Sequence, residues 1–211
     1  MSKQNYQYQL AKYPRYALDV PDADIEYLPE FIKIDVAWQL YERLLDQTQW
    51  RQERISLYGK MHKVPRLSCW IADPGLSYAY SNMTMHPVAW SPDLLEVKRQ
   101  IEQSLKTGSS AHFFNSVLLN HYRDGQDSNG WHSDDEPELG ANPVIASLSL
   151  GGGRDFHMRH KQDNALRKTI HLEHGSLLLM RGVTQHRWQH HIPKRANADS
   201  RINLTFRTIV N

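Results

Sequence analysis

The sequence predicts a mostly β protein with flanking helices (α+β), built as a sandwich or barrel of the jelly-roll type. From residue 113 onward, short apolar stretches alternate with clusters of Gly, Asn, Asp and Pro. This pattern is typical of many short strands joined by turns. Before it, two segments carry apolar residues at helical spacing. The chain has 211 residues, enough to bury a sizeable core, so we expect one domain with an N-terminal extension.

The predicted extension differs in composition from the rest of the chain. Residues 1–20 are polar and rich in tyrosine, without sustained periodicity, and we interpret them as an N-terminal arm. Residues 21–211 form the predicted domain, with a helical part at 21–110 and a jelly-roll core at 111–211.

Two helices are predicted in the first half of the chain. In segment 35–49, apolar residues recur at helical spacing, namely at Val36, Leu40, Leu44 and Leu45. The second helix follows the capping residue Ser91, with Pro92 at its first position. Its apolar stripe consists of Leu94, Val97, Ile101 and Leu105. We expect both helices to be scaffold, because such stripes usually pack on a core.

The second half of the chain predicts a series of strands. We expect them at residues 115–122, 144–150, 155–160, 168–172, 176–180 and 201–209. Three glycines, 151–153, lie between two of them and lack the helix start and Lys-Ser/Thr ending of a phosphate-binding loop, so a turn is expected. Segment 186–200 is basic and polar and is interrupted by Pro193, which favours a loop with His190 and His191 on the surface.

The composition bears on the cellular compartment of the protein. No apolar run approaches the roughly eighteen residues of a membrane span, and the polar N-terminus lacks the apolar core of a signal peptide. Cys69 is the single cysteine, which forbids an internal disulfide. We therefore expect a soluble protein that is not secreted and has no membrane partner, cytoplasmic in a bacterium or nuclear in a eukaryote. We also expect a monomer, although the sequence carries no signal for oligomeric state.

The net charge of +2 conceals a segregation of charge along the chain. Segment 51–66 carries five bases against Glu53, and segment 181–207 carries six bases against Asp199. This favours an anionic partner such as nucleic acid, although a solvated surface is the simpler alternative. Tyr58 lies among the first group of bases, which suits a wedge that enters a duplex while its neighbours hold phosphates. Alternatively, it packs on its own hairpin.

A candidate metal site begins at His132 and Asp134. In an extended segment, residues two apart project from the same face, so an imidazole and a carboxylate can meet one ion. We expect the third ligand to be His186, which follows the apolar run 177–180. Two imidazoles and one carboxylate with open positions form the ligand set of non-haem Fe(II) oxygenases. Any one of the twelve histidines could instead be an ordinary polar or core side chain.

Segment 201–207 alternates strictly between two kinds of residue. Ile202, Leu204 and Phe206 share one side, and the other side carries Arg201, Asn203, Thr205 and Arg207. Buried guanidinium groups need partners, which a dicarboxylate would supply. Asn120 and Tyr122 share a strand face in the same way and can hydrogen-bond a carboxylate. The alternative is a solvent-facing edge strand.

These residues together carry a resemblance to a known family. They occur in the order Asn120-x-Tyr122, His132-x-Asp134, His186 and Arg201-x-Asn203-x-x-x-Arg207. In this order they resemble the AlkB family of Fe(II)- and 2-oxoglutarate-dependent dioxygenases. The similarity covers residues 57–209 and includes Tyr78-Ala-Tyr80-Ser81, Asp134-Asp135-Glu136 and Arg154-Asp155-Phe156. It is greatest to the branch that contains the nuclear DNA-repair homologues of animals.

The resemblance implies a double-stranded β-helix and a full set of cofactor ligands. Fe(II) would be held by His132, Asp134 and His186. The cosubstrate 2-oxoglutarate would chelate the metal, with Arg207 near the chelating carboxylate and Arg201 with Tyr122 at the distal one. Asn120 and Asn203 belong to the same cosubstrate site, and O2 takes the last position on the metal.

The resemblance also implies a substrate, and part 21–110 would then recognise nucleotides. Tyr58 would act as the wedge, Tyr80 would stack on a flipped-out base above His132, and Tyr78 would bond nearby. Asp135, which we count among the catalytic residues, and Glu136 would favour a cationic base. The alternative is that one of the two acids only bonds a loop. The expected reaction is demethylation of 1-methyladenine and 3-methylcytosine in DNA. Alternatives are the same chemistry on RNA or on a substrate other than nucleic acid, and a catalytically silent binding module.

Overall fold

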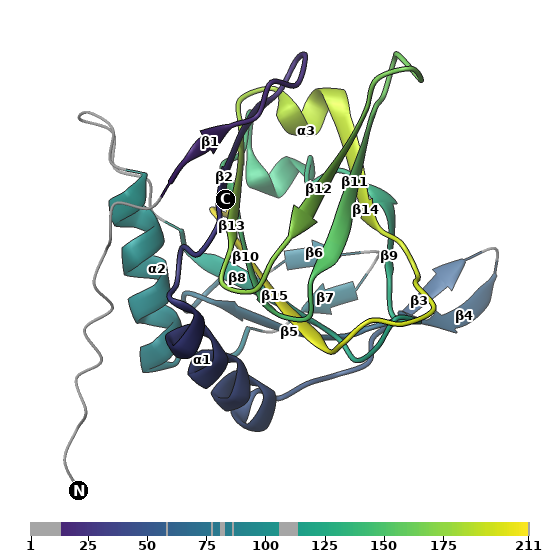
Figure 1. Cartoon of the computed structure of the whole chain (residues 1–211). Coiled ribbons are helices and arrows are strands. Elements are labelled where there is room, and N and C mark those ends of the chain that lie inside the picture. Colours follow the sequence, from purple (N-terminus) through teal and green to yellow (C-terminus); the bar gives the residue numbers. More distant parts are fainter. Residues whose placement is uncertain are drawn as a thin grey trace, which may run out of the picture.

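Two antiparallel sheets stacked face to face form the centre of the molecule (Figure 1). The computed structural model describes residues 14–57, 59–76, 78–80, 83–85, 87–105 and 114–210, without the side chains of 57, 78–80 and 83–85. The larger sheet has seven strands in the order β1-β2-β13-β10-β15-β8-β5, and the smaller has four in the order β12-β11-β14-β9. From β8 onward the chain passes back and forth between the two sheets, except at β11 and β12, which are neighbours in the smaller sheet. This is the jelly-roll arrangement.

The bounds of the elements are as follows. The larger sheet contains β1 (Tyr16–Ala17), β2 (Asp24–Leu28), β5 (Leu67–Ala72), β8 (Ser116–Tyr122), β10 (Ile145–Gly151), β13 (Leu177–Arg181) and β15 (Arg201–Arg207). The smaller contains β9 (Asn129–His132), β11 (Arg154–His160), β12 (Arg167–Leu172) and β14 (Trp188–Ile192). Two separate hairpins are β3 (Arg54–Leu57) with β4 (Lys60–Lys63), and β6 (Tyr78–Tyr80) with β7 (Met83–Met85). The helices are α1 (Ile34–Gln47), α2 (Pro92–Ser104), the short α3 (Thr184–Arg187) and a 3-10 turn (Pro137–Leu139).

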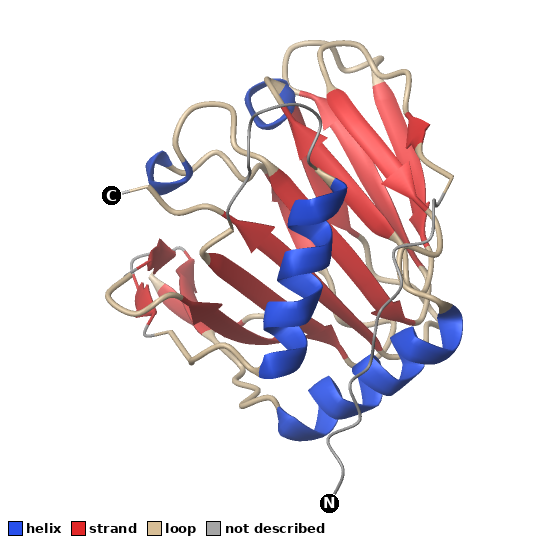
Figure 2. Cartoon of the chain, turned by 90° about the vertical axis from the view of Figure 1, so that its left-hand side faces the viewer, coloured by secondary structure: helices blue, strands red, loops and turns tan. Residues whose placement is uncertain are grey.

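Helices α1 and α2 cover the outer face of the larger sheet (Figure 2). Helix α2 begins where the Ser91 hydroxyl accepts a hydrogen bond from the Leu94 amide, an N-cap that satisfies an otherwise free donor. The apolar side of β15 faces these helices, and its residues Ile202, Leu204 and Phe206 are fully buried in that core. The opposite side of β15 is therefore free to face the smaller sheet.

Most predicted elements are confirmed, with ends that differ by one or two residues. The loop predicted at 186–200 was wrong for residues 188–192, which form β14. Trp188, His190 and Ile192 are buried and alternate with the half-buried Gln189 and His191, so the segment has the period of a strand. Pro193 follows the strand instead of interrupting it, as proline does at strand ends.

The larger sheet also contains β2 and β5, which come from the first half of the chain. The predicted division of the domain into a helical part, 21–110, and a jelly-roll core, 111–211, stays a prediction. Among the described residues, no helix has the length and apolar character needed to cross a membrane.

Candidate functional site

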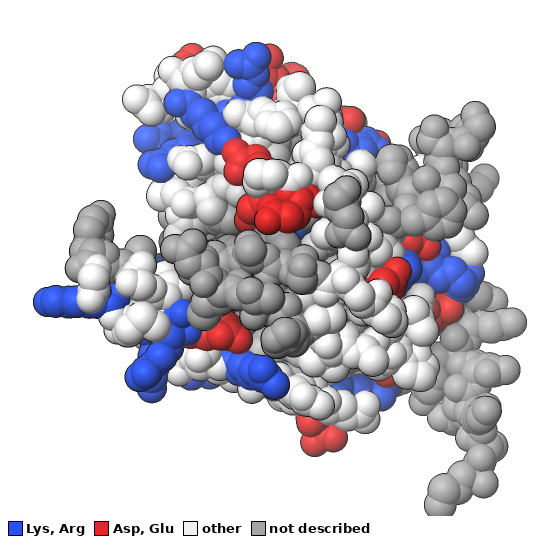
Figure 3. All heavy atoms as spheres, turned by 180° about the vertical axis from the view of Figure 1, so that it is seen from behind, with Lys and Arg blue, Asp and Glu red and all other residues white. Residues whose placement is uncertain are grey.

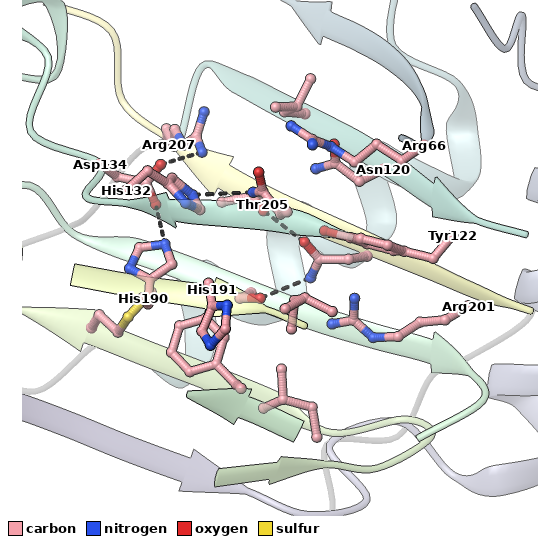
Figure 4. A pocket seen from close by; sticks show the side chains of 18 of the residues that line it. Arg66, Asn120, Tyr122, His132, Asp134, His190, His191, Arg201, Thr205 and Arg207 are labelled. Atoms are coloured by element: carbon pink, nitrogen blue, oxygen red, sulfur yellow. Dashed lines mark hydrogen bonds and ion pairs between the residues drawn. The ribbon is translucent and has the colours of Figure 1, made fainter. Parts of the chain in front are cut away.

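A cavity lies between the two sheets, lined by the polar side of β15 and its neighbours (Figure 4). Its empty volume, which includes the open mouth, is about 640 Å³, within the range of small-ligand sites. Antiparallel register places Arg201 opposite Tyr122 and Asn203 opposite Asn120. These four residues, which the sequence placed on the polar faces of two separate strands, thus line one cavity.

Three side chains converge at one end of the cavity. His132 ends β9, Asp134 follows it, and His190 lies on β14 in register with His132. One ligand atom of each lies within 4.8 Å of the others. Asp134 is further fixed by Arg207, whose Nη2 donates to its carboxylate at 2.5 Å, and by Gln185, whose Oε1 accepts from its backbone N–H at 3.0 Å. The group can bind one metal ion.

The prediction that His186 is the third member of this group was wrong. His186 lies on α3, is exposed, and accepts a weak hydrogen bond from the Asn142 amide at 3.4 Å. Its place is taken by His190, which was expected on the surface but is only 5% exposed. The single helical turn of α3 directs His186 outward, and the alternation of β14 then brings His190 inward.

The electrostatics suit metal binding. Burial alone would raise the pKa of Asp134, but Arg207, His190 and His132 outweigh it and hold that pKa below its usual value. Burial, together with His132, lowers the pKa of His190 to about 3. The site therefore offers a carboxylate and a neutral imidazole, which are the forms that coordinate metals.

The opposite end of the cavity holds a buried cation with spare donors. Arg201 is 1% exposed, and its Nη2 donates to the Ser149 hydroxyl at 3.0 Å. Its Nε and Nη1 have no partner among the described residues, and burial lowers its pKa to about 10. The guanidinium lies 5.3 Å from the centre of the Tyr122 ring. An anionic ligand with a carboxylate at this depth would satisfy donors that the protein leaves unpaired.

Further polar residues rigidify the wall between the two ends. Asn203 donates to the Ser147 hydroxyl at 2.8 Å and accepts from the Thr205 hydroxyl at 2.9 Å. Arg66 is 7% exposed and donates to Asn120 Oδ1 at 2.7 Å. The sequence indicated Arg66 only as part of a basic segment, because nothing in its local pattern marks it as buried.

A model of the 2OG-Fe(II) oxygenase superfamily matches residues 24–207. Alpha-ketoglutarate-dependent dioxygenase alkB homolog 3 of Bos taurus is 44% identical over 191 residues, which are 86% of this chain and 64% of that protein. DNA oxidative demethylase ALKBH2 of Homo sapiens is 36% identical over 184 residues, 83% of this chain and 69% of that protein. This chain belongs to the AlkB family of these oxygenases.

The solved structure of OsALKBH1 has the same fold, with a TM-score of 0.59 and 16% identity, and covers 92% of this chain and all of that one. The chain spans 64% of the length of the bovine alkB homolog 3. Membership of the AlkB family implies Fe(II), 2-oxoglutarate and O2. The residues of the cavity fit this set, since two imidazoles and a carboxylate suit Fe(II) and the spare donors of Arg201 suit a dicarboxylate.

Of the residues expected to contact a base, some line the cavity, some do not, and some lie outside the described residues. Glu136 lines the cavity, whereas Asp135 does not and instead accepts a hydrogen bond from Lys161 at 2.8 Å. The geometry thus matches the alternative in which one of the two acids bonds a loop. Tyr58 and the side chains of Tyr78 and Tyr80 lie outside the described residues, so their expected roles stay predictions.

Proposed function

We propose that this protein demethylates N-alkylated bases in DNA by oxidation, with 1-methyladenine and 3-methylcytosine as substrates. The observation that carries the proposal is one cavity with a His-Asp-His group at one end and Arg201 at the other, two of whose buried nitrogens lack a partner among the described residues. Relatives named DNA oxidative demethylase support the choice of DNA. RNA or a substrate other than nucleic acid remains the alternative.

The residues at the two ends would hold the cofactor and the cosubstrate. His132, Asp134 and His190 would bind Fe(II), while Arg201 with Tyr122 would bind the distal carboxylate of 2-oxoglutarate. Bound together, Fe(II) and 2-oxoglutarate supply the oxidation that inserts one oxygen atom of O2 into a methyl C–H bond. The other oxygen atom leaves in succinate, with release of CO2. The N-hydroxymethyl product then loses formaldehyde and leaves the unmodified base.

The chain itself orients the reactants and controls charge. Arg207 holds the Asp134 carboxylate in one orientation through an ion pair, so that a second carboxylate oxygen remains directed to the cavity. Glu136 places negative charge beside the cavity, which favours a base that methylation has made cationic. The two sheets exclude bulk water from the wall formed by β15, on which every residue is buried.

A basic surface is available for the phosphates of a nucleic acid. Lysines and arginines project from the β3–β4 hairpin at the left edge of Figure 3. Arg54, Lys60 and Lys63 on this hairpin are all exposed. Exposed cations supply affinity that does not depend on sequence, as expected for a protein that selects a damaged base.

The proposal is tested by reconstitution under anaerobic conditions with Fe(II) and 2-oxoglutarate. Air is then admitted in the presence of a DNA oligonucleotide that contains 1-methyladenine, and the mass of the oligonucleotide is followed. We expect loss of one methyl group with stoichiometric succinate and formaldehyde. Methylated RNA and a methylated peptide are assayed in parallel. Preferred turnover of either would replace DNA as the substrate, and turnover of none would remove the proposal.

A further inference from the structure

Two consecutive acids, Asp135 and Glu136, have different surroundings. The Asp135 carboxylate pairs with Lys161 Nζ at 2.8 Å, and its side chain is 41% exposed. Glu136 lines the cavity, and its Oε2 is buried without a partner among the described residues. One carboxylate is therefore neutralised outside the cavity, and the next is left uncompensated beside it.

Lys161 is held in place by more than this ion pair. Its Nζ also donates to the Gln185 carbonyl at 2.9 Å, and its backbone N–H donates to the Arg187 carbonyl at 2.7 Å. Exposed ion pairs add little to stability, but three contacts give this lysine a defined position. Because Gln185 also holds the backbone of Asp134, Lys161 belongs to the same network as the metal-binding group.

We infer that Lys161 is a specificity-determining residue, because it neutralises Asp135 and leaves Glu136 as the carboxylate that faces the base. The inference rests on the proposed function. Bases such as 1-methyladenine and 3-methylcytosine carry a positive charge, whereas 1-methylguanine and 3-methylthymine are neutral. A second free carboxylate directly before Glu136 in the chain would strengthen the preference for a cationic base, and a free lysine in its place would weaken it.

The experiment changes the charge of the pair in both directions. The variants are Lys161→Met, Asp135→Asn, the double variant and Lys161→Arg. Fluorescence anisotropy gives the Kd of short oligonucleotides with 1-methyladenine or 1-methylguanine on iron-free protein, and kcat/KM is measured with Fe(II) and 2-oxoglutarate. We expect the cationic-to-neutral preference to rise roughly three- to tenfold in Lys161→Met and to fall by a similar factor in Asp135→Asn.

The preference should return to the wild-type value in the double variant and be kept in Lys161→Arg. The effect should shrink between about 50 and about 300 mM salt, because ions screen partly exposed charges. The matched control is Lys168→Met. It removes a lysine charge from β12, the strand that follows Lys161 in the hairpin formed by β11 and β12.

Two outcomes separate this inference from the proposed function. If Lys161→Met and Asp135→Asn lower both affinities equally and leave the preference unchanged, the pair has a structural role only and the inference is overturned, while the function stands. If the wild-type protein demethylates neither cationic nor neutral bases, the proposed function fails and the inference fails with it.

Discussion

His186 and His190 offer the simplest test at the scale of single residues. His190 lies within 4.8 Å of His132 and Asp134 through its ligand atom, whereas His186 is exposed on α3. We expect His190→Ala to weaken metal binding by more than the roughly 10- to 100-fold that loss of an outer-shell partner causes. The measurement is titration with Co(II), whose absorption reports coordination. His186→Ala is the matched control and should bind Co(II) as the wild type does; equal losses in both variants would contradict the assignment.

Arg201 leads to a prediction with two independent readouts. Its Nε and Nη1 are buried and have no partner among the residues that the structure describes, so Arg201→Met should raise the thermal midpoint measured without added 2-oxoglutarate. The same change should weaken 2-oxoglutarate binding about 10- to 100-fold, since a charged pair of hydrogen bonds is lost. Pyruvate, which lacks the distal carboxylate, should bind both proteins alike. An unchanged 2-oxoglutarate affinity would exclude Arg201 from the site.

The sequence predicted the polar side of segment 201–207 but missed the metal ligand His190, and the difference has a physical reason. The alternation of segment 201–207 can be recognised in the sequence because every residue on one side is aliphatic or aromatic. In β14, by contrast, the inward positions include His190, and a histidine among polar neighbours does not mark a buried face. A metal ligand is buried because of its partners on other strands, which local sequence does not display.

At the scale of elements, turn signals located the strands, but local sequence does not specify which strands pair. The Gly-Gly-Gly segment gave a turn as expected, and Gly151 adopts φ 87°, a conformation that favours glycine. Neither the pairing of β14 with β9 nor the addition of β2 to the larger sheet could be predicted. Such pairing depends on contacts between residues far apart in the chain.

His174 connects two elements and makes their packing sensitive to pH. Its Nδ1 accepts from the Gly151 amide at 2.7 Å, at the end of β10, and its Nε2 lies 3.3 Å from the Ile34 carbonyl, at the start of α1. Burial lowers the pKa of His174, partly offset by the bond to Ile34. The folded protein thus favours the neutral ring, and the unfolded chain takes up the proton first as the pH falls.

The stability that His174 contributes should therefore be complete above the ordinary histidine pKa of about 6.5 and be lost as the pH falls below it. We expect wild type to lose more unfolding free energy than His174→Gln between pH 7.5 and 5.5, by at most about 1.4 kcal/mol per pH unit for one proton. Urea unfolding at several pH values measures this. Other histidines contribute to both proteins and cancel in the difference; parallel profiles would contradict the prediction.

At the scale of the whole molecule, the segregation of charge seen along the sequence becomes a spatial one. The basic segment 51–66 includes the projecting β3–β4 hairpin, whereas α1, which carries three acids against one arginine, packs away from that hairpin (Figure 1). Because opposite charges attract, we expect a polyanion to approach the molecule at the β3–β4 hairpin and not at α1.

This arrangement predicts how salt controls affinity for DNA. Each phosphate neutralised by a cation adds roughly 0.9 to the slope of log K against log salt for a duplex. Replacing Lys60 and Lys63 by Gln should therefore reduce the magnitude of the slope by about 1.8 if both meet phosphates. Lys33, exposed at the start of α1, is the matched control, and Lys33→Gln should leave the slope unchanged. Anisotropy with an unmodified duplex at several salt concentrations provides the values, and the same slope in all three proteins would place the DNA elsewhere on the surface.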